Sequence, residues 1–221
     1  MGKLVIILNG IEIFSAFAAT IIPLFEVVTA VVKVTKALVA KDLTQDQNAK
    51  EFNQIHAKLE SISKTNQQIL KQSQLDEVNE KYGKYEEYIK HQYTALITMV
   101  EQIQKDPEGR EEYMAEFQRV YERDLSDLSL NMYYKSVIEE EKAFEQKGLL
   151  KVYQEHYKQN RDVMEKRCSQ LANIFQMGLM TLMAYTVVTE EDEDVVREKW
   201  DPRMLEIQAK MIKALSQCEG N

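Results

Sequence analysis

Long stretches of this chain contain no residue that interrupts a helix. Between Pro23 and Pro107 the only glycine or proline is Gly83, and between Gly148 and Pro202 the only one is Gly178. The whole chain has 7 glycines and 3 prolines, whereas average usage in a chain of this length would give about 15 and 11. Sandwiches, barrels and wound α/β sheets need many more turn residues. The sequence therefore predicts an all-α fold: an elongated bundle of about five to seven helices, with long antiparallel helices, in a single domain over residues 1–221.

Two segments, 4–40 and 168–189, are more apolar than a small soluble bundle needs. The first has few charges, and Gly10 and Pro23 interrupt it. The second has 22 residues without a charge, about 33 Å if helical. A helix that is apolar all round is buried in protein or in lipid. The candidate residues on these faces, for lipid or core, are Phe14, Phe17, Ile21, Phe25, Val28 and Val32 in the first segment, and Phe175, Gly178, Leu179, Leu182 and Tyr185 in the second.

A narrow polar stripe accompanies the first apolar segment. Glu26, Lys33 and Lys36 fall on one side of a helix, with Thr29 between them. Such a stripe indicates the side that faces water or a polar neighbour. Removing its charge at Glu26 should therefore promote membrane insertion or aggregation.

A short coiled-coil seam follows in residues 52–69. Its members recur at spacings of 3, 4, 3, 4 and 3 residues, which is the a/d pattern of a heptad. Asn66 stands at an a position, where a buried Asn fixes register or strand number; alternatively, it marks the point where the seam meets solvent. The seam residues are Phe52, Ile55, Leu59, Ile62, Asn66 and Ile69.

The remaining helices are predicted from periodicity and turn residues. A helix over 76–105 ends at Asp106-Pro107-Glu108-Gly109, a strong turn signal. Another helix follows up to a break at 124–131, and the next one ends near Gly148 as its C′ residue. One long helix is expected over 149–188 and a last one over 191–217, which Pro202 should kink or restart.

Charge and cysteine content restrict the possible partners and compartment. The net charge is −8, so the chain has no overall attraction to nucleic acid. Cys168 and Cys218 form no disulfide framework; a reduced chain with Cys168 packed as a small hydrophobe is favoured over a disulfide. The five-residue apolar run at 4–8 is too short for a signal peptide. We expect an intracellular location, either cytoplasmic or membrane-associated.

No pattern in the sequence indicates catalysis or a cofactor. His56, His91 and His156 have no partner at metal-ligand spacing, and there is neither a di-iron Glu-x-x-His pair nor a glycine-rich phosphate loop. The neighbours of Cys168 are apolar, which does not favour a nucleophile. We therefore predict a non-enzymatic protein without metal, cofactor or identified small-molecule substrate.

Several of these patterns together resemble the rapunzel family of vertebrate proteins. The block 52–63 is similar to that family's first soluble helix, and Cys168-x-x-Leu171-x-x-x-Phe175-x-x-Gly178-Leu179 is similar to its C-terminal apolar helix. An acidic stretch and a lone Trp200 follow, and Pro23 divides a valine-rich N-terminal stretch. The resemblance implies a non-enzymatic protein linked to growth of fins and skeleton. The layout is also similar, as architecture alone, to α-helical pore-forming toxins.

Two functions remain open at this point. The first is a bundle that associates with membranes or conditionally inserts into them through 4–40 and 168–189, and a closed core of this kind could also hold a lipid. The second is a soluble protein that oligomerises or binds partner helices through the 52–69 seam, with the apolar segments as its core.

Overall fold

The computed structural model describes residues 24–40, 46–138 and 147–218. These residues form eight α-helices and one 3-10 turn and contain no strand, so the all-α prediction is confirmed. The elements are α3 (Leu24–Val39), α4 (Asp46–Gln72), α5 (Asp76–Lys105), η2 (Pro107–Gly109), α6 (Arg110–Arg123), α7 (Leu128–Ile138), α8 (Leu149–Tyr157), α9 (Arg161–Val188) and α10 (Glu193–Ser216).

The described helices outnumber the expected five to seven because the predicted 149–188 helix is divided. It breaks at Lys158–Asn160, where Asn160 caps α9 by accepting a hydrogen bond from the Val163 N–H at 3.2 Å. An Asn at this position satisfies a free N–H of the first turn. Gly148 is also placed differently: it is the N-cap of α8, with extended backbone, and not a C′ residue.

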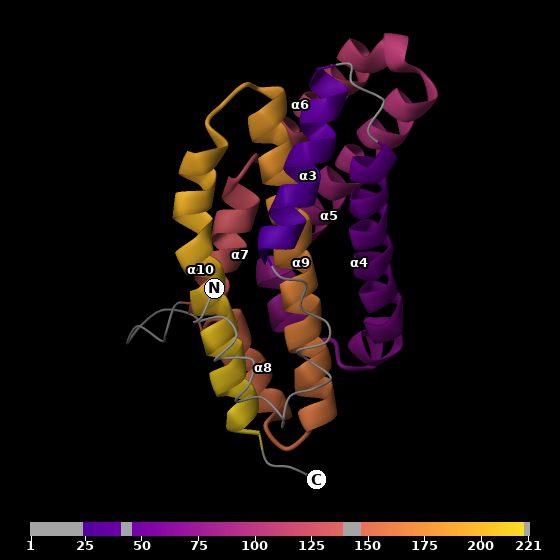
Figure 1. Cartoon of the computed structure of the whole chain (residues 1–221). Coiled ribbons are helices and arrows are strands. Elements are labelled where there is room, and N and C mark those ends of the chain that lie inside the picture. Colours follow the sequence, from indigo (N-terminus) through magenta and orange to yellow (C-terminus); the bar gives the residue numbers. More distant parts are fainter. Residues whose placement is uncertain (1–23, 41–45, 139–146, 219–221) are drawn as a thin grey trace.

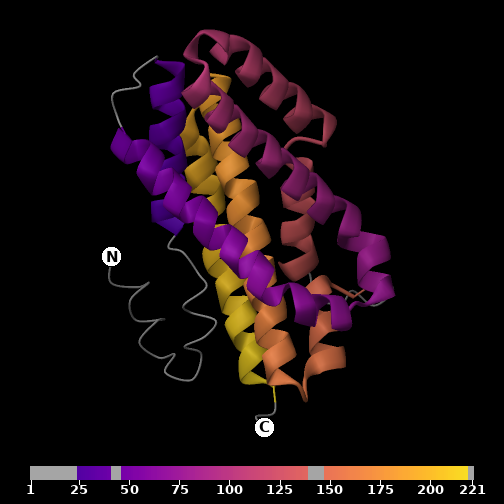
Figure 2. The ribbon, with the colours of Figure 1, turned by 90° about the vertical axis from the view of Figure 1, so that its right-hand side faces the viewer.

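Helix α9 lies at the centre of the bundle. Helices α3, α4, α5 and α10 all pack against it, and shorter contacts come from α6, α7 and α8. Figure 1 shows α3 running parallel to α9, and α10 returning antiparallel to it. Figure 2, from the side, shows α4 and α5 crossing over the other helices; they are joined at residues 73–75 and diverge from there.

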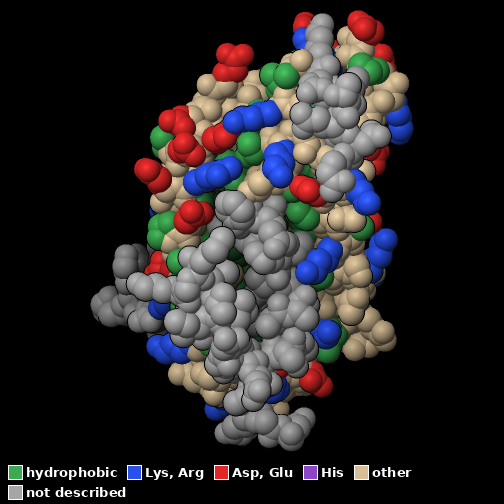
Figure 3. Space-filling model, in the orientation of Figure 1, with side chains coloured by type: hydrophobic (Ala, Val, Ile, Leu, Met, Phe, Trp, Pro, Cys, Tyr) green, Lys and Arg blue, Asp and Glu red, His purple; other side chains and the backbone are tan. Residues whose placement is uncertain are grey.

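One hydrophobic core runs through all of these helices, from Val27 on α3 to Cys218 beyond α10. Trp200, Met204 and Met211 attach α10 to it, and α10 continues unbroken through Pro202. On the face shown in Figure 3, hydrophobic side chains of the described residues appear only in small patches among charged ones. Among the described residues, the exposed large hydrophobic side chains are Leu125, Leu128, Val195 and Leu205, so the apolar surface is largely turned inward.

The predicted break after residue 123 is a tightly held turn. Leu125 and Ser126 have φ values of 71° and 50°, a region in which residues other than glycine are uncommon. The buried Gln92 of α5 holds the turn: its Nε2 donates to the carbonyls of Tyr121, Asp124 and Ser126 at 2.9–3.1 Å. These bonds pin the end of α6 to α5.

Candidate functional site

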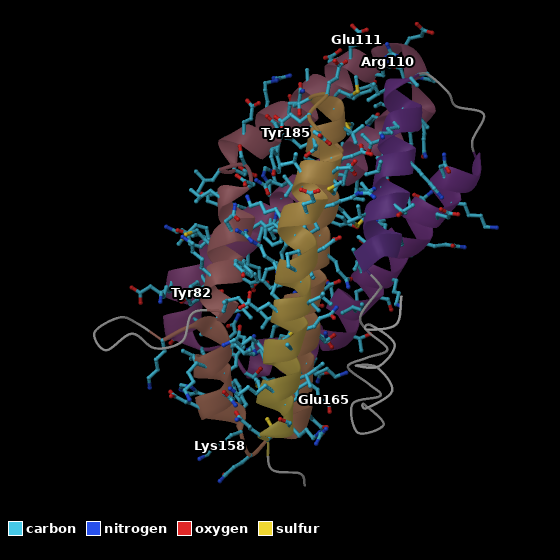
Figure 4. The ribbon with its side chains drawn as sticks, turned by 60° about the vertical axis from the view of Figure 1, so that its left-hand side comes forward. Tyr82, Arg110, Glu111, Lys158, Glu165 and Tyr185 are labelled. Carbon is cyan, nitrogen blue, oxygen red and sulfur yellow. The ribbon has the colours of Figure 1, made fainter. Side chains whose placement is uncertain are left out.

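The predicted apolar segment 168–189 is the buried core of α9. Phe175 and Leu179 are 0% and 1% exposed, and Gly178 and Leu182 are buried as well. Tyr185 is half-buried, stacks on Tyr121 and donates to Glu122 Oε1 at 2.9 Å. Figure 4 shows Glu165 and Tyr185 near opposite ends of this helix. The segment thus runs the length of the bundle within its core.

Gly178 marks a close approach of α7 to α9. A Cβ atom at this position would lie 2.5 Å from Leu130 Cδ1 of α7 and 3.4 Å from Ile89 Cγ2 of α5. The absent side chain therefore lets Leu130 pack directly on the α9 backbone.

Two buried polar residues of α9, Ser169 and Asn173, pair with polar groups of α4. Asn173 Nδ2 donates to Ser63 Oγ at 2.7 Å and to the Leu59 carbonyl at 3.2 Å. Asn66 Nδ2 donates to Ser169 Oγ at 3.2 Å. Buried polar groups without such partners would destabilise the fold. The pairs therefore fix the register of α4 on α9.

The 52–69 seam is the face of α4 that packs within this chain. Phe52, Leu59, Ile62 and Asn66 are buried, and Ile55 and Ile69 are half-buried at its edges. Asn66 is 2% exposed, so it does not mark the point where the seam meets solvent. The seam packs against α3 and α9.

Helix α3 covers α9 alongside α4. Val28 and Val32 are both buried, and Lys33 and Lys36 lie on the exposed side. Lys36 Nζ is 2.7 Å from Glu193 Oε1 of α10, and Lys33 Nζ is 3.7 Å from Glu51 Oε2 of α4. The two lysines of the predicted stripe thus connect α3 to the helices on either side. Phe14, Phe17 and Ile21 lie outside the described residues, as do the side chains of Phe25 and Glu26.

The C-terminal end of α3 is fastened by a third contact. Arg110 Nη1 donates to the Val39 carbonyl at 3.2 Å, and Figure 4 shows Arg110 beside that end of the helix. An arginine at the C-terminus of a helix satisfies a free carbonyl and complements the helix dipole.

A groove between α4 and α5 was not predicted from the sequence. It has a volume of about 710 Å³, and α4 and α5 form its walls. Its floor comes from α7, α8 and α9, with Tyr133, Leu149, Tyr153, Arg167, Leu171 and Met177 among the lining residues. The one available signal was Arg167, the last charge before the uncharged run.

Tyrosines surround the floor of this groove in their neutral form. Burial raises the pKa of Tyr133 well above its usual range, and Glu86, which accepts a hydrogen bond from its hydroxyl at 3.1 Å, adds to the shift. Burial also raises the pKa of Tyr153, although the nearby Arg167 acts in the opposite direction. Both hydroxyls are therefore hydrogen-bonding groups and not bases at neutral pH.

Catalytic and metal chemistry find little support in the described parts of the chain. No group of three or more His, Cys, Asp or Glu side chains there is arranged to hold a metal ion. Cys168 and Cys218 are free and buried, and burial raises the pKa of the Cys168 thiol. A thiol held in this state is a packing residue and not an activated nucleophile.

Of the described helices, α9 alone has the length and composition to cross a membrane. Here, however, 89% of its most apolar 18 residues are buried in the bundle. A core helix of a soluble protein can meet the same criteria, so composition alone does not assign it to lipid.

These features define a class of long-helix bundles that enclose one membrane-length apolar helix. The chain belongs to the family with a cephalotoxin-like middle helical domain, whose model matches residues 42–221. It is also similar to protein rapunzel of Danio rerio, with 29% identity over 216 residues, which cover 98% of this chain and 93% of that protein. The predicted resemblance to the rapunzel family is thereby confirmed, and neither name is that of an enzyme family. No solved structure matches the chain.

Proposed function

We propose that this protein is a non-enzymatic helical bundle that associates with membranes and conditionally inserts α9 into them. The observation that carries the proposal is the contrast between the composition of α9 and its position. Its uncharged stretch is about 33 Å long as a helix, and the hydrocarbon core of a bilayer is about 30 Å thick. In the bundle, α3, α4, α5 and α10 pack around this stretch.

The charges at the two ends of α9 are consistent with a spanning orientation. Lys166 and Arg167 precede the uncharged stretch, and five consecutive acidic residues follow it at 190–194. The polar residues within it, among them Asn173 and Ser169, make insertion marginal. Such a helix suits conditional insertion better than permanent anchoring, because in the bundle these residues already have hydrogen-bonding partners.

The cover formed by α3 supplies a route for release. Its lateral contacts include the Lys33–Glu51 and Lys36–Glu193 ion pairs, whose lysines are about half exposed. Exposed ion pairs contribute only about 0–1 kcal/mol each and weaken with salt. Displacing α3 therefore requires mainly the loss of its apolar contacts with α9, and a bilayer replaces such contacts.

The proposal is tested by vesicle binding combined with thiol labelling. Cys168 is fully buried, so in a Cys218→Ser background a water-soluble maleimide reports the opening of the bundle around α9. We expect anionic vesicles to increase Cys168 labelling, co-flotation of the protein and release of an entrapped dye. Lys36→Glu places a carboxylate beside that of Glu193 on α10, and the repulsion should increase labelling, co-flotation and dye release.

The matched control is Lys64→Glu, which makes the same charge change at an exposed ion pair on α4, away from α3. It should behave like the parent protein. Absence of co-flotation, dye release and labelling across several lipid compositions and pH values, for the parent and for Lys36→Glu, would contradict the membrane role.

That negative outcome would favour the second function, a soluble interaction protein. The surface that the sequence predicts for this function is the 52–69 seam. Because the seam packs on α3 and α9 of the same chain, a partner helix would have to displace one of them or bind elsewhere.

A further inference from the structure

The groove between α4 and α5 has the dimensions and the chemistry of a ligand site. Ligand pockets in proteins commonly have volumes of about 300–1,000 Å³ and occur between the helices of bundles. The volume here is about 710 Å³. Its apolar surface comes from half-buried side chains along the walls, namely Leu70, Leu75, Val78 and Ile97, and Tyr82 and Tyr93 line the α5 wall.

Arg167 places an unneutralised positive charge at this floor. Its Nη2 donates to the Leu70 carbonyl at 3.2 Å and to Ser73 Oγ at 2.9 Å, and also to the Ser73 carbonyl. Its guanidinium lies 5.0 Å from the centre of the Tyr153 ring. All of these partners are neutral, and among the described residues no carboxylate forms an ion pair with it.

Two hydrogen-bonding atoms on the same turn of α9 are buried without a partner. They are Nε of Arg167 and Oε1 of Gln170, three residues further along the helix. Gln170 is 91% buried and lines the groove. A buried polar atom without a partner destabilises a fold, typically by about 1–3 kcal/mol. A ligand removes that cost if it accepts a hydrogen bond from the Arg167 Nε–H and from the NH₂ of Gln170, with the amide turned so that its nitrogen takes the place of Oε1.

The charges on the rim do not compete with this site. Glu60 is paired with Lys64 at 3.5 Å and Glu86 with Lys90 at 2.5 Å. Of the other charged residues in the lining, Glu101 lies 4.0 Å from Lys105, and Lys71 and Glu87 carry opposite charges. The rim is therefore close to neutral overall, and Arg167 is the charge at the floor that remains to be matched. A cationic ligand would meet like charge at the floor, and a neutral one would leave the guanidinium without a counter-ion.

We propose that this groove binds a single-chain amphiphile with a carboxylate head, of the fatty-acid type. The head accepts hydrogen bonds from Arg167 Nε and from the side-chain amide of Gln170. This amide donates through its NH₂ group after it has rotated so that its nitrogen and oxygen exchange places. The chain lies between the two walls, against Leu70 of α4 and Val78 and Ile97 of α5. Arginine is the side chain best suited to such a carboxylate, because charge-assisted hydrogen bonds are about twice as strong as neutral ones. This inference rests on the groove alone and does not require insertion of α9.

The test uses the full chain without lipid and titrates it with oleate below the concentration at which oleate aggregates. Calorimetry should detect saturable binding of oleate, and oleyl alcohol and an oleyl trimethylammonium salt should bind at least about 10-fold more weakly. Arg167→Met should weaken oleate binding by roughly 10- to 100-fold. Lys166→Met, the same change at the preceding residue, should have no effect.

Arg167 also holds the end of α4, so Arg167→Met could fail to fold. Gln170→Glu gives an independent test, because it preserves side-chain size and leaves Arg167 in place. The new carboxylate should pair with Arg167 and repel the ligand head, which should abolish oleate binding while the helical circular dichroism stays unchanged. Gln208→Glu on α10 is the matched control and should bind oleate normally.

Three outcomes would overturn the proposal. They are the absence of oleate binding by the parent protein, equal affinities for oleate and oleyl alcohol, and unchanged oleate affinity in a folded Gln170→Glu variant. Vesicle insertion is measured in a separate experiment. Absence of oleate binding therefore leaves the proposed membrane function intact, and absence of vesicle insertion leaves the oleate site intact.

Discussion

Helices α4 and α9 have nearly the same length, 27 and 28 residues, and pack against each other, yet their surfaces differ fundamentally. On α4, one face is buried and the other carries exposed charges such as Lys58 and Lys64. On α9, every residue from Cys168 to Ala184 is buried, polar ones included. The difference shows that central position, and not length, determines the apolar character of α9. Ser169 and Asn173 find partners on α4, and Thr181 and Thr186 donate to carbonyls of α9 itself.

The largest expected effect is the loss of the whole fold at alkaline pH. Burial raises the pKa of several tyrosines around α9, and that of Tyr185 to about 12, compared with about 10 when exposed. The folded state stabilises the neutral form, so this contribution is complete below pH 10 and is lost as pH rises towards 12. Unfolding and tyrosinate absorbance should therefore change together. Ionisation of these tyrosines in a chain that remains folded would contradict their burial.

The next largest effect should come from the core of α9. Phe175→Ala removes a fully buried ring that lies 5.4 Å from the Tyr133 ring, centre to centre. We expect it to lower the free energy of unfolding by about 3–5 kcal/mol. Leu205→Ala, at a site 45% exposed on α10, should change it by less than about 0.5 kcal/mol. Urea denaturation gives both values, and similar losses would mean that α9 is not the core.

Gly178 on the central helix α9 can be compared with Gly83 on α5. Gly178→Ala on α9 drives a methyl group against the buried Leu130 and should destabilise by about 1–3 kcal/mol. Gly83→Ala on α5 meets only the side chain of Asn79, which is exposed and can move. Its better helix propensity should stabilise by up to about 1 kcal/mol. Melting temperatures should shift in opposite directions, and a shared direction would contradict the close packing at Gly178.

The smallest effect concerns the polar contact between α4 and α9. A double-mutant cycle of Asn66→Ala and Ser169→Ala should give a coupling energy of about 0.5–1.5 kcal/mol. Replacing Ser169→Ala in that cycle by Ser129→Ala, a buried serine that bonds to the Asp124 carbonyl instead, should give a value near zero. Equal couplings in the two cycles would show that the contact does not set the register.

Much of the fold follows from residues that act locally. Asp106-Pro107 ends α5 at Lys105 as predicted, because proline cannot continue a helix. The a/d spacing identified the buried face of α4. The break between α8 and α9 was missed because Lys158-Gln159-Asn160 contains neither glycine nor proline. Asn160 itself was the available signal, since its side chain caps α9.

The groove depends on contacts that sequence patterns do not carry. Its residues come from helices about a hundred positions apart, as the Arg167–Leu70 hydrogen bond across 97 positions illustrates. Periodicity assigns each residue to a face of its own helix but does not say which helix lies opposite. The divergence of α4 from α5, which opens the groove, is a property of three-dimensional packing alone.

The central position of α9 also governs how this protein is made. At about 5–20 residues per second, α9 is synthesised roughly 7–30 s after α3. The valine-rich face of α3 therefore emerges long before its packing partner exists. The ion pair from Lys36 to Glu193 spans 157 positions and can close only after that. The described core can therefore close only after α9 and α10 have been synthesised.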